Sequence, residues 1–356
     1  MAMLFGDSFD AYSAGLGDLT EKWLDTGAGT GINATGGRFG FGAYQFTDDG
    51  NTPITSRNFS SIIGSPTNPR GGTLNPFRFA AHVKMEGGLS GEDDFLRIYT
   101  DDDSRADIRV DSSGRIVVRR LDATSSNSPA ATGIVNIADG NWHHIELELV
   151  FDNSNGVIKL WVDGIADISE TTIDSLSDGT FGTNGIDIIE LHGYANSANS
   201  FWDDVVCWDD EGSFTGQLGQ HRFDLLTPNA DGTTTDFTTS TGVDHHALVD
   251  ETPANDSDYV ESGTSTEKDL FEYTDLSVTP NSIAGVLVNT RAFNPDIGAI
   301  SMNMVARSNT TEADSPNRSL TSSARLYQHF FDQDPDTTSA WTKTGIDSAE
   351  FGVKVV

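Results

Sequence analysis

The sequence has one cysteine, little positive charge and no long apolar run. Cys207 is the only cysteine among 356 residues, so the chain cannot form an internal disulfide. Lysine and arginine number 21 against 54 aspartates and glutamates, a formal net charge of −33. Such a chain is repelled by phosphate backbones and anionic lipid, and no run of 18 apolar residues could span a bilayer. We therefore expect neither nucleic acid nor membrane as a partner.

The amino-terminal residues 1–10, MAMLFGDSFD, lack the basic region and apolar core of a secretory signal peptide. We therefore expect a protein that is made and folded in the cytosol. Its length is too great for one compact sandwich and suits two domains.

Short β-prone runs separated by Gly, Asn, Asp, Ser and Thr clusters dominate the chain. Only residues 11–23 and 337–349 could form short helices. Regularly spaced strands without helical patterns between them favour an antiparallel sandwich. The runs in the first part are 38–46, 77–85, 95–100, 115–121, 142–151, 157–162, 186–193 and 201–208.

The clearest pattern is a predicted hairpin that joins residues 142–151 to residues 157–162 through a turn rich in Asn and Gly. In the first arm, alternation places apolar side chains on one face and His144, Glu146 and Glu148 on the other. This second face is expected to be exposed to solvent.

The predicted hairpin reads W-H-H, then an apolar–polar repeat, a turn and finally K-L-W-V-D-G. This pattern resembles the central hairpin of the laminin-G/pentraxin branch of concanavalin A-like jelly rolls. The run Phe201–Asp209 resembles the closing strand of that family. The resemblance covers roughly residues 1–210 and implies a jelly-roll sandwich there.

The amino-acid composition changes after Trp208. Residues 211–268 are rich in Asp, Gly and Thr and predict an extended connector with short strands. Residues 269–356 contain further β-prone runs and predict a smaller domain, to which residues 221–249 can contribute strands. The predicted fold class is thus all-β, with an N-terminal concanavalin A-like jelly-roll sandwich and a smaller C-terminal β-sandwich domain.

The domain order also resembles virion proteins of tailed bacteriophages. The residues that carry this resemblance are Phe5–Asp10 with Tyr12, the connector segment Pro228–Gly232, and the closing segments Trp341–Ala349 and Phe351–Val353. The resemblance implies a non-enzymatic structural protein on the exterior of a phage particle, as a head decoration or a tail- or fibre-associated protein. It further implies a virion location, other virion proteins as partners, a homo-oligomer such as a trimer, and contact with a host-surface glycan.

A carbohydrate-binding, lectin-like module or adhesin is the alternative. Alternation along the run 201–208 places Trp202, Asp204 and Trp208 on an outward face, which could contact a partner or a glycan. Packing of this face against the connector or the second domain is the simpler interpretation.

A glycan hydrolase is the third hypothesis. In the related β-glucanases, a signature resembling E-I-D-I-x-E supplies two carboxylates. Here residues 185–190 read G-I-D-I-I-E, so the last two acids, Asp187 and Glu190, are present, but Gly185 replaces the first and the outer pair is broken. Because one carboxylate cannot run that mechanism, we expect no enzyme activity.

Calcium is the most credible ion, since proteins that resemble this domain often bind it through Asp side chains. The candidate ligands are Asp163, Asp203 and Asp204, with residues 48–49 and 101–103 as further acidic loops. Because the ligands have no regular spacing, no cofactor other than this calcium ion is predicted. The adjacent pairs 143–144 and 245–246 cannot each chelate one ion, because neighbouring strand residues point to opposite faces. Cys207 is expected to be buried and inert.

Overall fold

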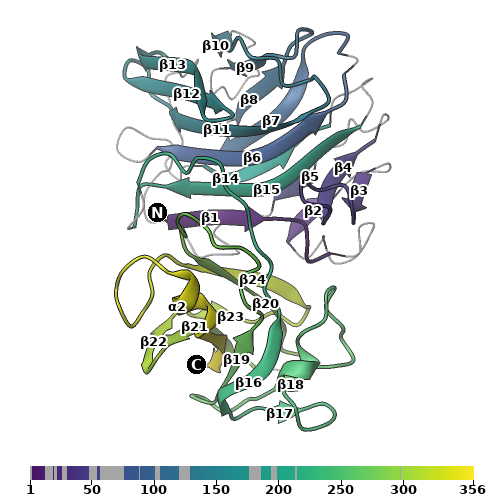
Figure 1. The fold of residues 1–356 in the computed structure, drawn as a ribbon, viewed down its shortest axis with the longest axis vertical. Helices are drawn as coiled ribbons and strands as arrows, with labels where there is room; N and C mark the ends of the chain where they lie inside the picture. Colours follow the sequence, from purple (N-terminus) through teal and green to yellow (C-terminus); the bar gives the residue numbers. More distant parts are fainter. Residues whose placement is uncertain are drawn as a thin grey trace. The chain divides into compact units, whose positions relative to one another are not determined.

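The computed structural model describes residues 2–12, 19, 22–25, 30–47, 54–56, 76–87, 89–100, 105–119, 129–175, 186–193, 199–212, 215–296 and 298–356. The chain forms two compact units, which meet in sequence between Phe223 and Asp224 (Figure 1). The first unit therefore includes the start of the predicted connector. None of the helices in the described residues is long and apolar enough to cross a membrane.

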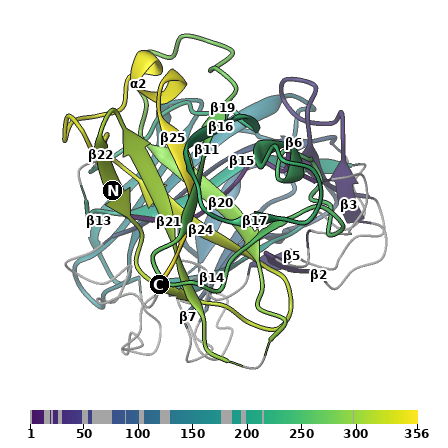
Figure 2. The same cartoon turned by 90° about the horizontal axis from the view of Figure 1, so that it is seen from below.

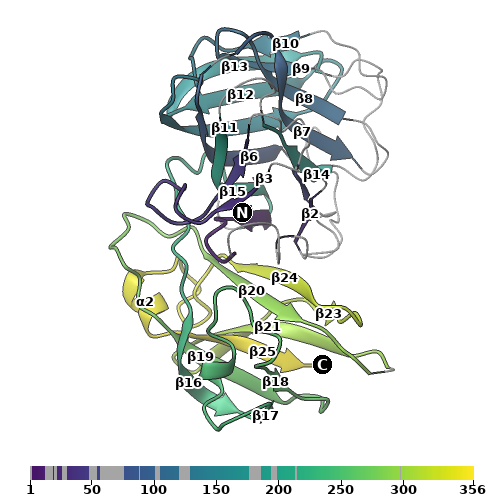
Figure 3. The ribbon, with the colours of Figure 1, turned by 90° about the vertical axis from the view of Figure 1, so that its right-hand side faces the viewer.

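Two antiparallel sheets form the first unit, as Figure 3 shows. The eight-stranded sheet runs β13-β12-β11-β6-β15-β4-β3, with β1 paired to β15; the seven-stranded sheet runs β10-β9-β8-β7-β14-β5-β2. The bounds are β1 Ala2–Asp7, β2 Trp23–Asp25, β3 Thr30–Asn33, β4 Ala43–Phe46, β5 Ile54–Ser56, β6 Phe77–Met85, β7 Asp93–Thr100, β8 Arg105–Val110, β9 Ile116–Arg119, β10 Pro129–Thr132, β11 Trp142–Val150, β12 Gly156–Val162, β13 Ile165–Ile173, β14 Ile186–Leu191 and β15 Ser200–Asp209.

The sheets enclose a core built from the apolar face of each strand. Along β12, buried residues alternate with half-buried ones, as expected for a strand with one face in a core. The predicted hairpin is confirmed, with β11 and β12 paired from Ile145↔Val162 to Val150↔Val157. Strands β11 and β15 are instead buried almost throughout. Their outer face is covered by residues 215–223, which we call the strap.

A bulge in β15 changes the predicted direction of its side chains. The pairing with β6 shifts between Asp203 and Val206, and Asp204 has a φ of 51°. Before the bulge, Trp202 points into the core, where its ring centroid lies 4.5 Å from that of Phe95 in the opposite sheet. After the bulge, Trp208 lies on the outer face. The two tryptophans therefore do not share a face.

The second unit, seen from below in Figure 2, is also a β structure. A six-stranded sheet runs β16-β19-β25-β21-β22, with β23 paired to β21, and two further sheets pair β17 with β18 and β20 with β24. The bounds are β16 Pro228–Thr235, β17 Thr238–Thr239, β18 Val260–Glu261, β19 Lys268–Tyr273, β20 Val286–Ala292, β21 Ser301–Ser308, β22 Thr311–Asp314, β23 Arg318–Ser319, β24 Arg325–Phe331, β25 Glu350–Val355 and the helix α2 Lys343–Asp347. The chain is thus all-β, as predicted.

Two local expectations have different outcomes. The predicted helix at residues 337–349 is present as α2, whose first turn is capped by the Thr342 side chain, which accepts a hydrogen bond from the Gly345 amide at 3.0 Å. The predicted helix at residues 11–23 lies largely outside the described residues.

Candidate functional site

The predicted glycan face of Trp202, Asp204 and Trp208 does not form. Trp202 is 1% exposed and Trp208 is fully buried. The indole N–H of Trp208 donates to the carbonyl oxygen of Gly216 at 3.3 Å, so the strap covers this ring. That contact matches the simpler interpretation, packing against the connector, and corrects the assignment of these rings to a glycan platform.

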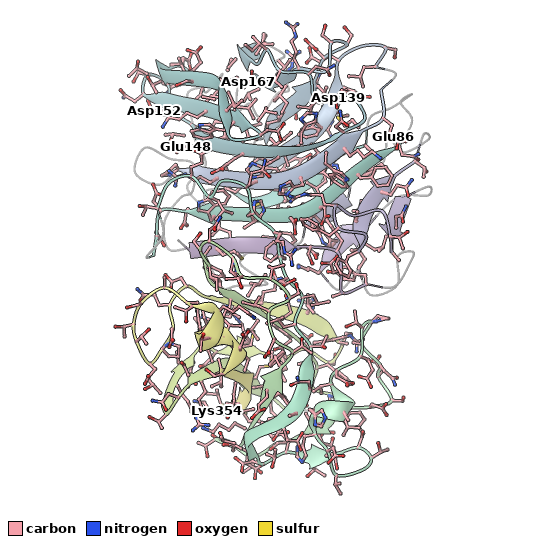
Figure 4. The ribbon with its side chains drawn as sticks, viewed as in Figure 1. Glu86, Asp139, Glu148, Asp152, Asp167 and Lys354 are labelled. Carbon is pink, nitrogen blue, oxygen red and sulfur yellow. The ribbon has the colours of Figure 1, made fainter. Side chains whose placement is uncertain are left out.

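Asp163, one of the three predicted calcium ligands, contacts a histidine. Its carboxylate is 2.8 Å from Nδ1 of His143 and accepts the amide of His144 at 2.9 Å. Asp139, labelled in Figure 4, contacts the other ring nitrogen of His143 at 3.0 Å. Burial by itself would lower the pKa of His143. The two carboxylates stabilise the charged ring more strongly than burial destabilises it, so the pKa of His143 is raised. Asp163 therefore positions a histidine.

Asp203 and Asp204 hold backbone segments in place. Asp203 accepts the amide of Arg38 at 2.9 Å, and Asp204 accepts the amide of Phe223 at 2.8 Å and the guanidinium of Arg38 at 3.2 Å. Burial raises the pKa of Asp203 to about 6, and burial together with Asp203 raises the pKa of Asp204 well above its usual range. Burial and Asp203 also raise the pKa of Asp10 to about 7.

No metal centre is found in the part of the chain that the structure describes, since no three His, Cys, Asp or Glu side chains there are grouped so as to hold an ion. The acidic residues 48–49 and 101–103 lie outside the described residues. Cys207 is buried, as expected, and burial raises the pKa of its thiol well above its usual range.

Three histidines meet beneath the strap, and we call His82, His144 and His221 the histidine cluster. The ring centroids lie 4.9 to 5.3 Å apart. His221 comes from the strap, whereas the other two lie on the outer face of β6 and β11. Burial and nearby positive charge lower the pKa of His144 to about 3, and burial lowers that of His221 to about 4.

Glu146 fastens the strap to the same face. Its carboxylate is fully buried and accepts the amides of Leu218 at 2.7 Å and Gly219 at 2.9 Å. The expectation that His144 and Glu146 face solvent is therefore wrong. Residues that lie more than 70 positions further along the chain cover them, which alternation within the hairpin cannot reveal.

The histidine cluster predicts a specific pH dependence of stability. Because the pKa of His144 is near 6.5 when unfolded and about 3 when folded, the unfolded chain binds an additional proton between these values, and this site lowers stability as the pH falls. Asp10 and Asp203, whose pKa values are raised, act with the opposite sign between about pH 4 and 7.

We therefore expect His144→Gln to gain stability relative to the natural chain by about 2 kcal/mol on going from pH 7.5 to pH 4.5. Urea unfolding followed by tryptophan fluorescence at both pH values measures this difference. An equal effect of the substitution at both values would show that His144 is not held neutral by the fold.

A second cluster occupies the outer face of the seven-stranded sheet. In register across β14, β7 and β8, Glu190 lies opposite Arg97, which lies opposite Asp107. Asp94 lies opposite Arg109 on the same face. Arg119 of β9 and Glu92, which precedes β7, extend the row. We call these residues, together with Tyr99, the charged face.

Ion pairs interlock the charged face. Arg97 lies 3.4 Å from Asp107 and 3.5 Å from Glu190, and its guanidinium donates to Asp94. Arg109 lies 3.1 Å from Asp94 and 3.3 Å from Asp107. The side chains of both arginines are 20% exposed, so the pairs are partly desolvated and their geometry is fixed.

Arg119 ends the row with a hydrogen bond of 2.8 Å to Glu92. At the opposite end, Tyr99 donates its hydroxyl to the Glu190 carboxylate at 2.7 Å, and the ring of His192 lies 3.3 Å from the same oxygen. The charged face therefore offers aligned hydrogen-bond donors and acceptors.

Sequence reasoning found only Glu190 of this face. The signal for the rest is the apolar–polar alternation in residues 96–99 and 106–110, which places Arg97 with Tyr99 and Asp107 with Arg109. That these two strands are neighbours is a long-range fact that alternation does not contain.

Comparison with known proteins gives only distant similarities. No protein-family model matches the chain, and no curated protein sequence matches it. Among solved structures, the chain is similar to the alginate lyase Aly36B (11% identity, TM-score 0.36, 57% of this chain and 95% of that one). It is also similar to the cellulose induced protein Cip1 (14%, 0.37, 57% and 96%) and to the Crh5 transglycosylase (11%, 0.39, 58% and 84%).

These comparisons correct the prediction of a non-enzymatic structural protein on a phage particle. The alginate lyase and the transglycosylase are enzymes, and none of the three names describes a virion component. The prediction that the chain is not an enzyme is contradicted in the same way. Because all three TM-scores are below 0.5, the structural similarity identifies neither a ligand nor a reaction for this chain. A function can therefore be inferred only from the residues of the chain itself.

Proposed function

We propose that the chain is a carbohydrate-binding protein whose charged face contacts the glycan. The observation that carries the proposal is the row of Glu190, Arg97 and Asp107 across three strands, together with Tyr99 and Arg109 on the same face. Carboxylates accept and guanidinium groups donate several hydrogen bonds each, which matches the paired hydroxyls of sugars.

The ion pairs support this proposal because they hold the side chains before a ligand arrives. A site in which rotamers are locked loses less entropy on binding than one of mobile side chains. The long side chains of Arg97 and Arg109 are each fixed by two or more carboxylates. The buried rings of Trp202 and Trp208 take no part in this proposal.

Affinity electrophoresis of the full chain in gels that contain soluble polysaccharides tests the proposal. We expect retardation by at least one polysaccharide, and a roughly five- to tenfold weaker affinity for Tyr99→Phe, which removes one hydroxyl from the face. Lys159→Gln, on the outer side of β12, is the matched control and should bind normally. Equal binding by all three proteins would place the glycan elsewhere.

Glycan cleavage is the second candidate, because the structure supplies the carboxylate that the sequence motif lacked. Asp107 and Glu190 lie on one face with β7 between their strands, so their backbones are about 9 to 10 Å apart at strand spacing. Both carboxylates lean toward Arg97, at 3.4 and 3.5 Å, and inverting glycosidases hold their two carboxyl groups about 6.5–9.5 Å apart. Release of reducing ends by the natural chain, lost in Glu190→Gln and Asp107→Asn, would establish cleavage; binding without release leaves the first proposal alone.

A further inference from the structure

We infer that the charged face selects neutral glycans over acidic ones. The inference rests on the glycan-binding function proposed above and names the class of ligand that the same site takes. It follows from the charge balance of the face, from the hydrogen-bonding capacity left on its arginines, and from the net charge of the whole chain.

Each of the three arginines of the charged face, Arg97, Arg109 and Arg119, is already paired with at least one carboxylate. Arg97 is within 3.5 Å of two carboxylates and donates to a third, and Arg109 is within 3.3 Å of two. Arg119 is bonded to Glu92. The described face thus sets the four carboxylates of Glu92, Asp94, Asp107 and Glu190 against three guanidinium groups.

A sugar acid would have to displace one of these carboxylates to reach a guanidinium. The displaced group would stay beside the incoming negative charge, and like charges placed together at an interface oppose binding. The formal charge of −33 on the chain adds long-range repulsion at low salt. Among the side chains that the structure describes on this face, an acidic glycan therefore gains no free positive charge.

A neutral sugar meets no such conflict, because a hydroxyl group both donates and accepts. Among the described residues, Arg97 hydrogen-bonds Asp94 alone, and Arg109 hydrogen-bonds Asp107 alone. The Nε–H group of each arginine is buried, so the Nη–H groups are the donors that remain for a ligand. Vicinal hydroxyls can accept from these Nη–H groups and donate to neighbouring carboxylate oxygens while every ion pair stays intact. Because positive and negative side chains alternate along the row, successive pairs of hydroxyls can make the same hydrogen bonds.

Polygalacturonate in its free-acid form and the same polymer after full methyl esterification provide a matched pair that differs in charge. We expect the full chain to bind neutral polymers, tested as the esterified polymer and a panel of soluble β-glucan, arabinan and galactomannan, at least tenfold more tightly than the free acid. The affinity for the neutral polymer should change less than about twofold between 20 and 200 mM NaCl, since no net charge is neutralised.

Asp94→Asn sharpens the test by removing one carboxylate between Arg97 and Arg109. We expect the ratio of acidic to neutral affinity to rise about five- to tenfold in this variant, whereas the control Lys159→Gln should leave the ratio unchanged. Tighter binding of the free acid by the natural chain would overturn the inference and leave glycan binding in place. Absence of binding to every polymer would contradict the proposed function itself.

Discussion

Replacing Trp202 with alanine is expected to destabilise the first unit by about 3 to 5 kcal/mol, the usual cost of removing a large aromatic side chain from a packed core. The ring lies against Phe95 of the opposite sheet and Phe79 of its own, and its N–H donates to the carbonyl oxygen of His192 at 3.2 Å. The substitution therefore leaves a cavity between the sheets and an unsatisfied backbone acceptor.

Urea unfolding followed by fluorescence measures this loss, with Phe41→Ala as the matched aromatic control. Phe41 is 61% exposed, so its removal should change stability by less than about 0.5 kcal/mol. If Trp202→Ala kept full stability and lost glycan affinity instead, the ring would belong to a binding surface and the orientation set by the bulge would be wrong.

The second large effect is expected at Arg97. Removing its guanidinium in Arg97→Ala should weaken glycan binding about 10- to 100-fold, the range for lost hydrogen bonds to a charged group. Because this variant also leaves three carboxylates without their shared partner, some loss of stability is expected too.

Arg97→Lys separates the two effects. Lysine keeps the positive charge, so the fold should be retained, but it cannot reproduce the planar fork that bonds several partners at once. Titration calorimetry with the best-bound neutral oligosaccharide should show about a tenfold loss for this variant and none for Lys354→Gln, a change in the second unit (Figure 4). A lysine variant with natural affinity would limit the role of Arg97 to charge.

The strands and the hairpin can be predicted from the sequence, because both depend on residues that are close together along the chain. Alternation in residues 142–151 and 157–162 correctly predicted which side chains share a face. It failed along β15, where the bulge at Asp203–Asp204 inserts a shift that alternation cannot anticipate, and so Trp202 turned inward.

The burial of Glu146 was missed for a different reason. Its partners, the amides of Leu218 and Gly219, come from a segment whose composition predicts an extended connector. The charged face was also beyond local reasoning, since Glu190 was noticed through a motif while Asp107 came from a strand 83 positions earlier. Both features arise from pairing between distant segments, which the order of residues alone leaves open.

Hydrogen–deuterium exchange of the full chain, with and without a bound neutral polysaccharide, tests the central claim most directly. The account predicts slower exchange in β7, β8 and β14 on binding, with no change in the strap, because the strap covers the opposite sheet. Protection confined to the strap, to the loop that carries Phe41 or to the second unit would contradict the assignment of the glycan to the charged face.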